Sequence, residues 1–153
     1  MPIHSDQTNG VSIRRHCMQS LLRSAICGEP SDCLGVLAGS DNIMDTTIDV
    51  TKNLSHSAPS THLFTSDMNR QLDMKGVRPM GIYHHQKADR APIEALKALY
   101  RSAFAEEPAL LLILDDDHKG RIDAHLYAGS DHHRRINLDM IEDGPLYPAV
   151  MTR

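Results

Sequence analysis

The sequence has few aromatic residues and no tryptophan. Aromatic residues make up 4% of the 153 residues. Proteins that bind single-stranded nucleic acids commonly stack bases on exposed aromatic rings, so this scarcity argues against such a platform. An excess of basic residues is missing too: sixteen Lys and Arg stand against twenty Asp and Glu, which gives a net charge of −4. Because duplex binders neutralise phosphates with cations, we expect no nucleic-acid partner.

Long apolar runs and paired cysteines are also lacking. No segment approaches the run of about 18 apolar residues that a membrane span requires, so we expect no membrane partner. The three cysteines are odd in number and form no CxxC pair. The N-terminal residues show no apolar secretory region. Together these features predict a reducing compartment and a cytoplasmic location.

The remaining composition is that of a globular protein. Hydrophobic residues make up 41% and charged residues 24% of the chain, a balance that supports a buried core. We predict a polar, flexible lead-in over residues 1–10 and a single domain over residues 11–138. Gly144, Pro145 and Pro148 predict an irregular C-terminal tail over residues 139–153.

Hydrophobic periodicity and turn residues predict an α/β (α+β) fold, a mixed β-sheet flanked by helices. The elements expected in order are a helix over residues 13–25, a hairpin of strands at 33–39 and 46–50, a helix from residue 66 or 67 to 74, a strand at 80–83, a helix from residue 92 to before 108, and strands at 110–114 and 122–127. Residues 55–60 are expected to form a loop.

The candidate functional residues lie where the strand at 80–83 ends. His84 and His85 follow this strand directly, and a polar loop leads from them to Pro92 and a helix. A strand end is a rigid platform from which a loop can place ligands around a metal. The two imidazoles point to opposite faces if the strand continues, and they can converge if the chain turns there. The other interpretation is that both are simply polar residues beside a loop.

This region resembles the signature of the JAMM/MPN metallopeptidases, which is His-x-His, seven residues and then Ser-x-x-Asp. Here Gly81-Ile82-Tyr83-His84-His85-Gln86 is followed by the helix that Pro92 begins. Upstream, the segment from Pro30 to Gly39 is similar to the first block of that family, in which a carboxylate precedes a Gly-x-Leu-x-Gly-type strand. The similarity spans roughly residues 12–128 in element order and spacing. It implies a JAMM/MPN-like fold, with layers arranged as in cytidine deaminases.

In that family two His and one Asp bind zinc, and a Glu acts as general base. The resemblance places His84 at the first ligand and Gln86 at the second, with His85 between them. Matching the proline before the helix places Leu96 at the Asp position, whereas strict spacing places Lys97 there. Asp32 matches the general base. Because neither Leu nor Lys can replace the Asp ligand and Gln binds zinc poorly, the sequence predicts that the standard site is lost.

Two functions follow from the resemblance. The first is a catalytically inactive JAMM/MPN-like protein that binds a protein or peptide partner as a scaffold and carries no cofactor. The alternative is a divergent zinc-dependent peptidase or isopeptidase, with His84 and His85 on the metal and Asp32 as base. A third possibility keeps the α/β domain but treats the resemblance as accidental and predicts no site near His84.

Overall fold

The structure is a computed structural model that describes residues 10–27, 33–50, 58–116, 121–129 and 134–143. In chain order its elements are β1 (Gly10–Arg14), α2 (Arg15–Cys27), β2 (Leu34–Ser40), β3 (Ile43–Asp49), α4 (Ala58–Lys75), β4 (Arg78–His85), α5 (Arg90–Phe104), β5 (Leu110–Asp116), β6 (Ile122–Ala128) and β7 (Arg134–Ile141). None of the helices in these ranges is long and apolar enough to cross a membrane.

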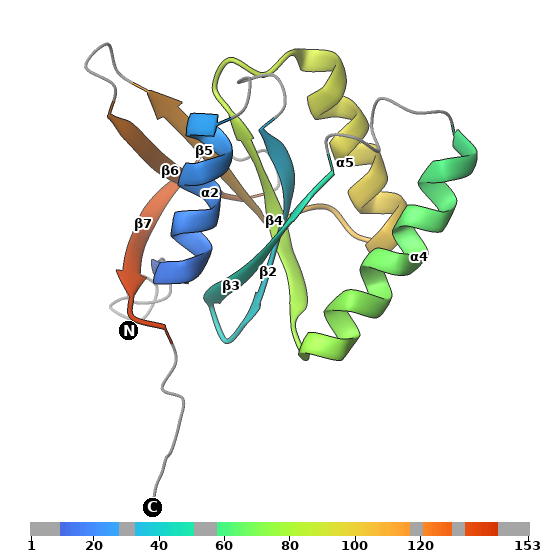
Figure 1. Cartoon of the computed structure of the whole chain (residues 1–153), viewed down its shortest axis with the longest axis horizontal. Helices are drawn as coiled ribbons and strands as arrows, with labels where there is room; N and C mark the ends of the chain where they lie inside the picture. The colour runs from blue at the N-terminus through green and yellow to red at the C-terminus, as the bar shows by residue number, and fades with distance from the viewer. Residues whose placement is uncertain (1–9, 28–32, 51–57, 117–120, 130–133, 144–153) are drawn as a thin grey trace, which may run out of the picture.

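The strands form one mixed sheet that closes on itself as a barrel. Their order is β1-β3-β2-β4-β5-β6-β7, and β7 pairs with β1 to complete the ring. The β1–β3, β1–β7 and β4–β5 pairs are parallel, and the other pairs are antiparallel. Figure 1 shows α2 on one side of this sheet and the neighbouring helices α4 and α5 on the other. The predicted mixed sheet flanked by helices is confirmed.

A tight hairpin joins β2 and β3. Its two turn residues, Asp41 and Asn42, have φ values of 54° and 63°. Positive φ at both central positions gives a turn whose twist matches that of the flanking strands, and Asp and Asn tolerate this conformation better than most residues. The hairpin predicted from the β-branched residues and the Ser40-Asp41-Asn42 turn is therefore confirmed.

The inner face of the sheet packs on α2. Alternate residues along the strands, such as Leu110, Leu112 and Leu114 of β5, point inward and join Cys17 and Leu21 of α2 in one cluster. Tyr83 of β4 belongs to this cluster and is 1% exposed. The Tyr83 ring lies over Gly35 of the neighbouring strand β2. A Cβ at position 35 would lie 2.7 Å from the Tyr83 hydroxyl, so the ring fits only because this residue is glycine.

The outer face packs on α4 and α5. Ile82 of β4 and Val36 of β2 meet Met68 of α4 and Leu96 of α5 in a second apolar cluster. The helix α5 contributes its buried residues at the spacing of one helical face: Leu96, Leu99 and Tyr100. Successive residues of β4 therefore belong to different layers, and this alternation decides how His84 and His85 are placed.

The structure differs from the sequence-based expectation in three places. The helix predicted from residue 13 begins at Arg15, because Ile13 belongs to β1. The helix α4 begins at Ala58, so the last three residues of the predicted loop at 55–60 are helical, and Ser66 and Asp67 lie inside the helix. The strand β7 continues to Ile141, three residues into the predicted irregular tail. Residues 144–153 of that tail lie outside the described residues.

Candidate functional site

The two candidate histidines end β4 and face opposite sides of the sheet. The strand continues through His85, which is the condition under which the two imidazoles were expected to point to opposite faces. His84 pairs in register with Leu34, whose side chain belongs to the outer cluster. His84 is 8% and His85 1% exposed. Because the sheet separates their side chains, these two imidazoles do not converge on one metal ion.

His85 lies on the inner side, in contact with an acidic residue of β5. Its Nδ1 accepts a hydrogen bond from the backbone N–H of Lys87 at 3.0 Å, so the ring proton of neutral His85 resides on Nε2. Nε2 lies 3.2 Å from Oδ1 of Asp116, and the Lys87 ammonium lies 3.9 Å from the same oxygen. That oxygen is buried and receives no well-aligned hydrogen bond. The His85–Asp116 contact is therefore electrostatic.

His84 lies on the outer side, facing α5. Its Nδ1 is 2.8 Å from the backbone oxygen of His85, so Nδ1 donates and Nε2 keeps its lone pair. Burial lowers the pKa of His84, and the charge of Lys97 lowers it further, against the opposing effect of the backbone hydrogen bond. His84 is therefore a neutral imidazole at pH 7, with one nitrogen able to accept a proton or bind a metal.

The other positions of the expected zinc site hold no matching ligand. Leu96 has no exposed surface and packs in the outer apolar cluster. Lys97, at the strict spacing, lies 3.6 Å from the Glu94 carboxylate. With its amide nitrogen facing β5, Gln86 donates to both carboxylate oxygens of Asp115, at 3.0 Å for Oδ2. Asp32, the predicted general base, lies outside the described residues.

These residues do not fit the three-ligand zinc site of the JAMM/MPN family. Within the described ranges, no group of three or more His, Cys, Asp or Glu side chains is arranged to hold a metal ion. The neighbouring thiols are not activated nucleophiles either. Burial raises the pKa of Cys17 to about 12 and of Cys33 to about 11, so both are protonated at pH 7.

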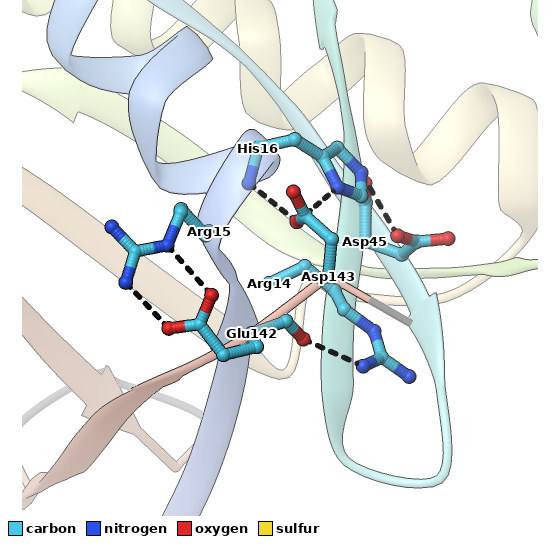
Figure 2. Close-up of polar contacts among 6 residues, drawn as sticks. All are labelled: Arg14, Arg15, His16, Asp45, Glu142 and Asp143. Atoms are coloured by element: carbon cyan, nitrogen blue, oxygen red, sulfur yellow. Dashed lines mark hydrogen bonds and ion pairs between the residues drawn. The ribbon is translucent and has the colours of Figure 1, made fainter. Parts of the chain in front are cut away.

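A second polar cluster, which the sequence interpretation missed, joins the start of α2 to the residues after β7 (Figure 2). We name it the α2 clasp: Arg14, Arg15, His16, Asp45, Glu142 and Asp143. The Arg15 guanidinium donates to both Glu142 carboxylate oxygens, at 3.0 Å and 2.5 Å. Arg14 donates to the backbone oxygen of Glu142 at 2.9 Å.

His16 is held between two carboxylates in this clasp. Its backbone N–H donates to Asp143 Oδ1 at 2.8 Å, and its Nδ1 lies 2.6 Å from the same oxygen. Nε2 lies 3.0 Å from Asp45 Oδ1 and 2.8 Å from the Asp45 backbone oxygen. Burial acts to lower the pKa of His16, but Asp143 and Asp45 outweigh it, so the pKa is raised. Partners separated by 127 residues left no local signal by which the sequence could have predicted this cluster.

No protein-family model and no curated protein matches this chain. Solved structures do. The solution structure of a protein from Desulfitobacterium hafniense is 13% identical, covers 87% of this chain and 94% of that one, and has a TM-score of 0.56. The crystal structure of a JAB1/MPN domain protein from Archaeoglobus fulgidus is 15% identical, covers 86% of this chain and 97% of that one, and has a TM-score of 0.49.

At these identities the likeness concerns the fold alone. The chain has the same α+β architecture as the Desulfitobacterium hafniense protein. A JAB1/MPN domain protein is among the structural neighbours. The loss of the zinc motif and the roles of Asp32, His84 and His85 stay predictions.

Proposed function

We propose that this chain is a JAMM/MPN-like protein-binding module in which residues of the core and of ion pairs occupy the positions of the zinc ligands. The observation that carries the proposal is Leu96. It occupies the position of the Asp ligand in the resemblance, and it has no exposed surface. A carboxylate there would have to enter an apolar cluster, and burial of a charge in such a cluster is costly.

The surface we propose for the partner lies beside the former site, at the ends of β4 and β5. Gln86 is exposed, and Lys87 is exposed over 64% of its side chain. Asp115 and Asp116 lie next to them at the end of β5. A mixed set of amide, cation and carboxylates offers donors and acceptors to a polar peptide segment, and side chains at the ends of strands are held rigidly.

Photo-crosslinking tests this surface. A photoreactive residue is placed at Gln86 in one variant and at Gln71 in the control. Gln71 is exposed on α4 and, like Gln86, donates its amide to an aspartate, here Asp67 at 2.8 Å. The proposal expects a discrete protein adduct from position 86 and none of that mass from position 71. Equal adducts from both positions, or none from position 86, would contradict it.

The competing function is the divergent zinc peptidase or isopeptidase. One observation favours it: the lowered pKa of His84 keeps one ring nitrogen free to bind a metal at neutral pH. In this alternative His84 and His85 would hold zinc, Asp32 would serve as general base, and zinc would polarise the scissile carbonyl. The separation of the two imidazoles by the sheet weighs against a shared ion.

Elemental analysis separates the two functions. The untagged protein is equilibrated with zinc, desalted and measured beside His84→Ala, because a His tag would itself bind the metal. The binding module retains no stoichiometric zinc. About one zinc per chain, lost in His84→Ala, would overturn the proposal and favour the hydrolase. Zinc retained equally by both proteins would place the metal elsewhere and exclude the site at His84.

A further inference from the structure

A pocket opens at the end of the sheet opposite the histidines. Its volume is about 270 Å³. It begins at Pro79 and Met80 of β4, whereas His85 ends the same strand. Six residue steps at about 3.3 Å separate Pro79 from His85, so the two sites lie roughly 20 Å apart. The pocket is therefore distinct from the site of the proposed function, and its role does not depend on that function.

The floor of the pocket is apolar and comes from five strands of the closed sheet. It consists of Val11, Met80, Leu110, Ala128 and Ile136. Four of these residues keep 6–9% of their surface exposed, whereas Leu37 and Leu112, deeper in the same cluster, keep none. A ligand with an apolar body would remove this residual surface from water, which is favourable.

The rim of the pocket carries charges of both signs. Glu106 and Arg134 line it, and both are exposed. Neither forms an ion pair or a side-chain hydrogen bond with another described residue. The neighbouring Glu107 differs in this respect, because Arg101 donates to it at 3.2 Å. Tyr100 also lines the pocket, and burial raises its pKa, with the Glu106 charge adding to the effect.

We propose that this pocket binds a free α-amino acid with an apolar side chain. The side chain rests on the apolar floor, the ammonium faces the Glu106 carboxylate, and the carboxylate faces the Arg134 guanidinium. A simple anion would leave Glu106 without a counter-charge, and a simple cation would leave Arg134 without one. Only a zwitterion supplies a counter-charge to both residues. Pockets for drug-sized ligands start at about 300 Å³, so a volume below that suits a smaller molecule.

The test is a titration of the full chain with L-leucine, followed by ¹H–¹⁵N NMR shifts of backbone amides. We expect saturable shifts at pocket residues with a dissociation constant on the order of 1 mM, as befits a small ligand. Two analogues measure how much each charged group of leucine contributes to binding: 3-methylbutylamine lacks the carboxylate, and 4-methylpentanoate lacks the ammonium. Both should bind more weakly than leucine, by up to about 5-fold for each exposed ion pair that the analogue cannot form.

Rim variants assign each charge. Glu106→Gln should weaken the binding of leucine without weakening that of 4-methylpentanoate. Arg134→Gln should weaken the binding of leucine without weakening that of 3-methylbutylamine. The matched controls are Glu94→Gln and Arg135→Gln, which change exposed charges that do not line the pocket. All four substitutions are at exposed positions, so folding is preserved.

Three results would overturn the proposal. The first is the absence of shifts at about 10 mM leucine, well above the expected dissociation constant. The second is equal binding of leucine and both analogues, which would make the pocket a purely apolar site. The third is equal binding of leucine and N-acetyl-leucinamide, which carries neither charge and stands for a side chain within a partner peptide.

Discussion

Two clusters of this protein combine histidines with carboxylates, and the pKa values of His84 in one and His16 in the other are shifted in opposite directions. At the end of β4, His84 and His85 are nearly fully buried, and burial lowers the pKa of His84. In the α2 clasp, His16 keeps 51% of its side chain exposed, and two carboxylates raise its pKa. The balance between desolvation and opposite charges decides the sign of each shift. A histidine at a strand end is therefore no sign of a charged or metal-bound residue by itself.

The largest effect is expected from restoring the missing ligand. Leu96→Asp places a carboxylate in the outer apolar cluster and should lower the free energy of unfolding by at least about 4 kcal/mol, since it removes a buried Leu and adds an unpaired polar group. Urea denaturation measures the change. Leu96→Met, which keeps the volume, should cost less than about 1.5 kcal/mol. An Asp variant as stable as the Met variant would mean that the position can host a ligand.

The next effect concerns His85. His85→Ala should lower the free energy of unfolding by about 2–3 kcal/mol, because it leaves a cavity and removes the partner of the buried Asp116 oxygen. The matched variant is His85→Ala with Asp116→Asn, in which position 116 no longer carries a charge. If the double variant is only as stable as the sum of the two single changes predicts, or less stable, the His85–Asp116 contact is not the stabilising interaction we describe.

The sequence predicts an element of the fold where that element carries its own pattern of apolar residues. The strand at 110–114 and the helix after Pro92 are predictable because each carries its own periodic pattern, and both are present as β5 and α5. The strand β1 escapes prediction because it passes directly into α2 between Arg14 and Arg15, with no turn residue between them. The strand β7 is not among the predicted elements, although Ile136, Leu138 and Met140 alternate with polar residues as in a half-buried strand.

The site is predictable in the same partial way. His84 and His85 stand out because they follow a recognisable strand, and the alternation of a strand is enough to raise the question of opposite faces. The burial of Leu96 follows from its place on the apolar stripe of the helix. Asp45 and Asp143, by contrast, meet His16 only through the closure of the sheet. Long-range contacts of this kind carry no pattern that a single sequence displays.

The opposite pKa shifts predict opposite pH dependences of stability. The raised pKa of His16 means that its contribution is fully present below about pH 6.5, the ordinary His pKa, and is lost as the pH rises through the higher folded value. The lowered pKa of His84 means the reverse: stability is lost as the pH falls below about 6.5 toward the folded value. Between about pH 8 and pH 5.5, the advantage of the native protein should grow over His16→Gln and shrink relative to His84→Gln.

Urea unfolding of the three proteins across this range measures both trends, and NMR titration of the ring protons gives the midpoints directly. The His16 midpoint should lie above that of an unstructured His peptide, and the His84 midpoint below it. Equal midpoints for His16 and His84 would contradict the opposite pKa shifts of the two clusters.

The smallest effect is expected at the exposed edge of the α2 clasp. Arg15→Gln removes the paired hydrogen bonds to Glu142 and should destabilise the protein less than His85→Ala, because both partners are solvated. The effect should disappear in about 1 M salt, where charges are screened within about 3 Å. A matched change at Arg70, which pairs with Asp67 inside α4, should show the same salt dependence. A destabilisation that persists in salt would mean that Arg15 acts through packing.

The parallel pairing of β1 with β7 has a consequence for how the chain folds. Gly10 lies beside Asn137 and Arg14 beside Ile141, so the ring closes between residues 127 positions apart. Contacts of such long range form only after the entropy of a large loop has been given up, and they slow folding. During synthesis β1 has no β7 to pair with until residues 137–141 have left the ribosome. Until then the N-terminal strand remains open to pairing with a second nascent chain.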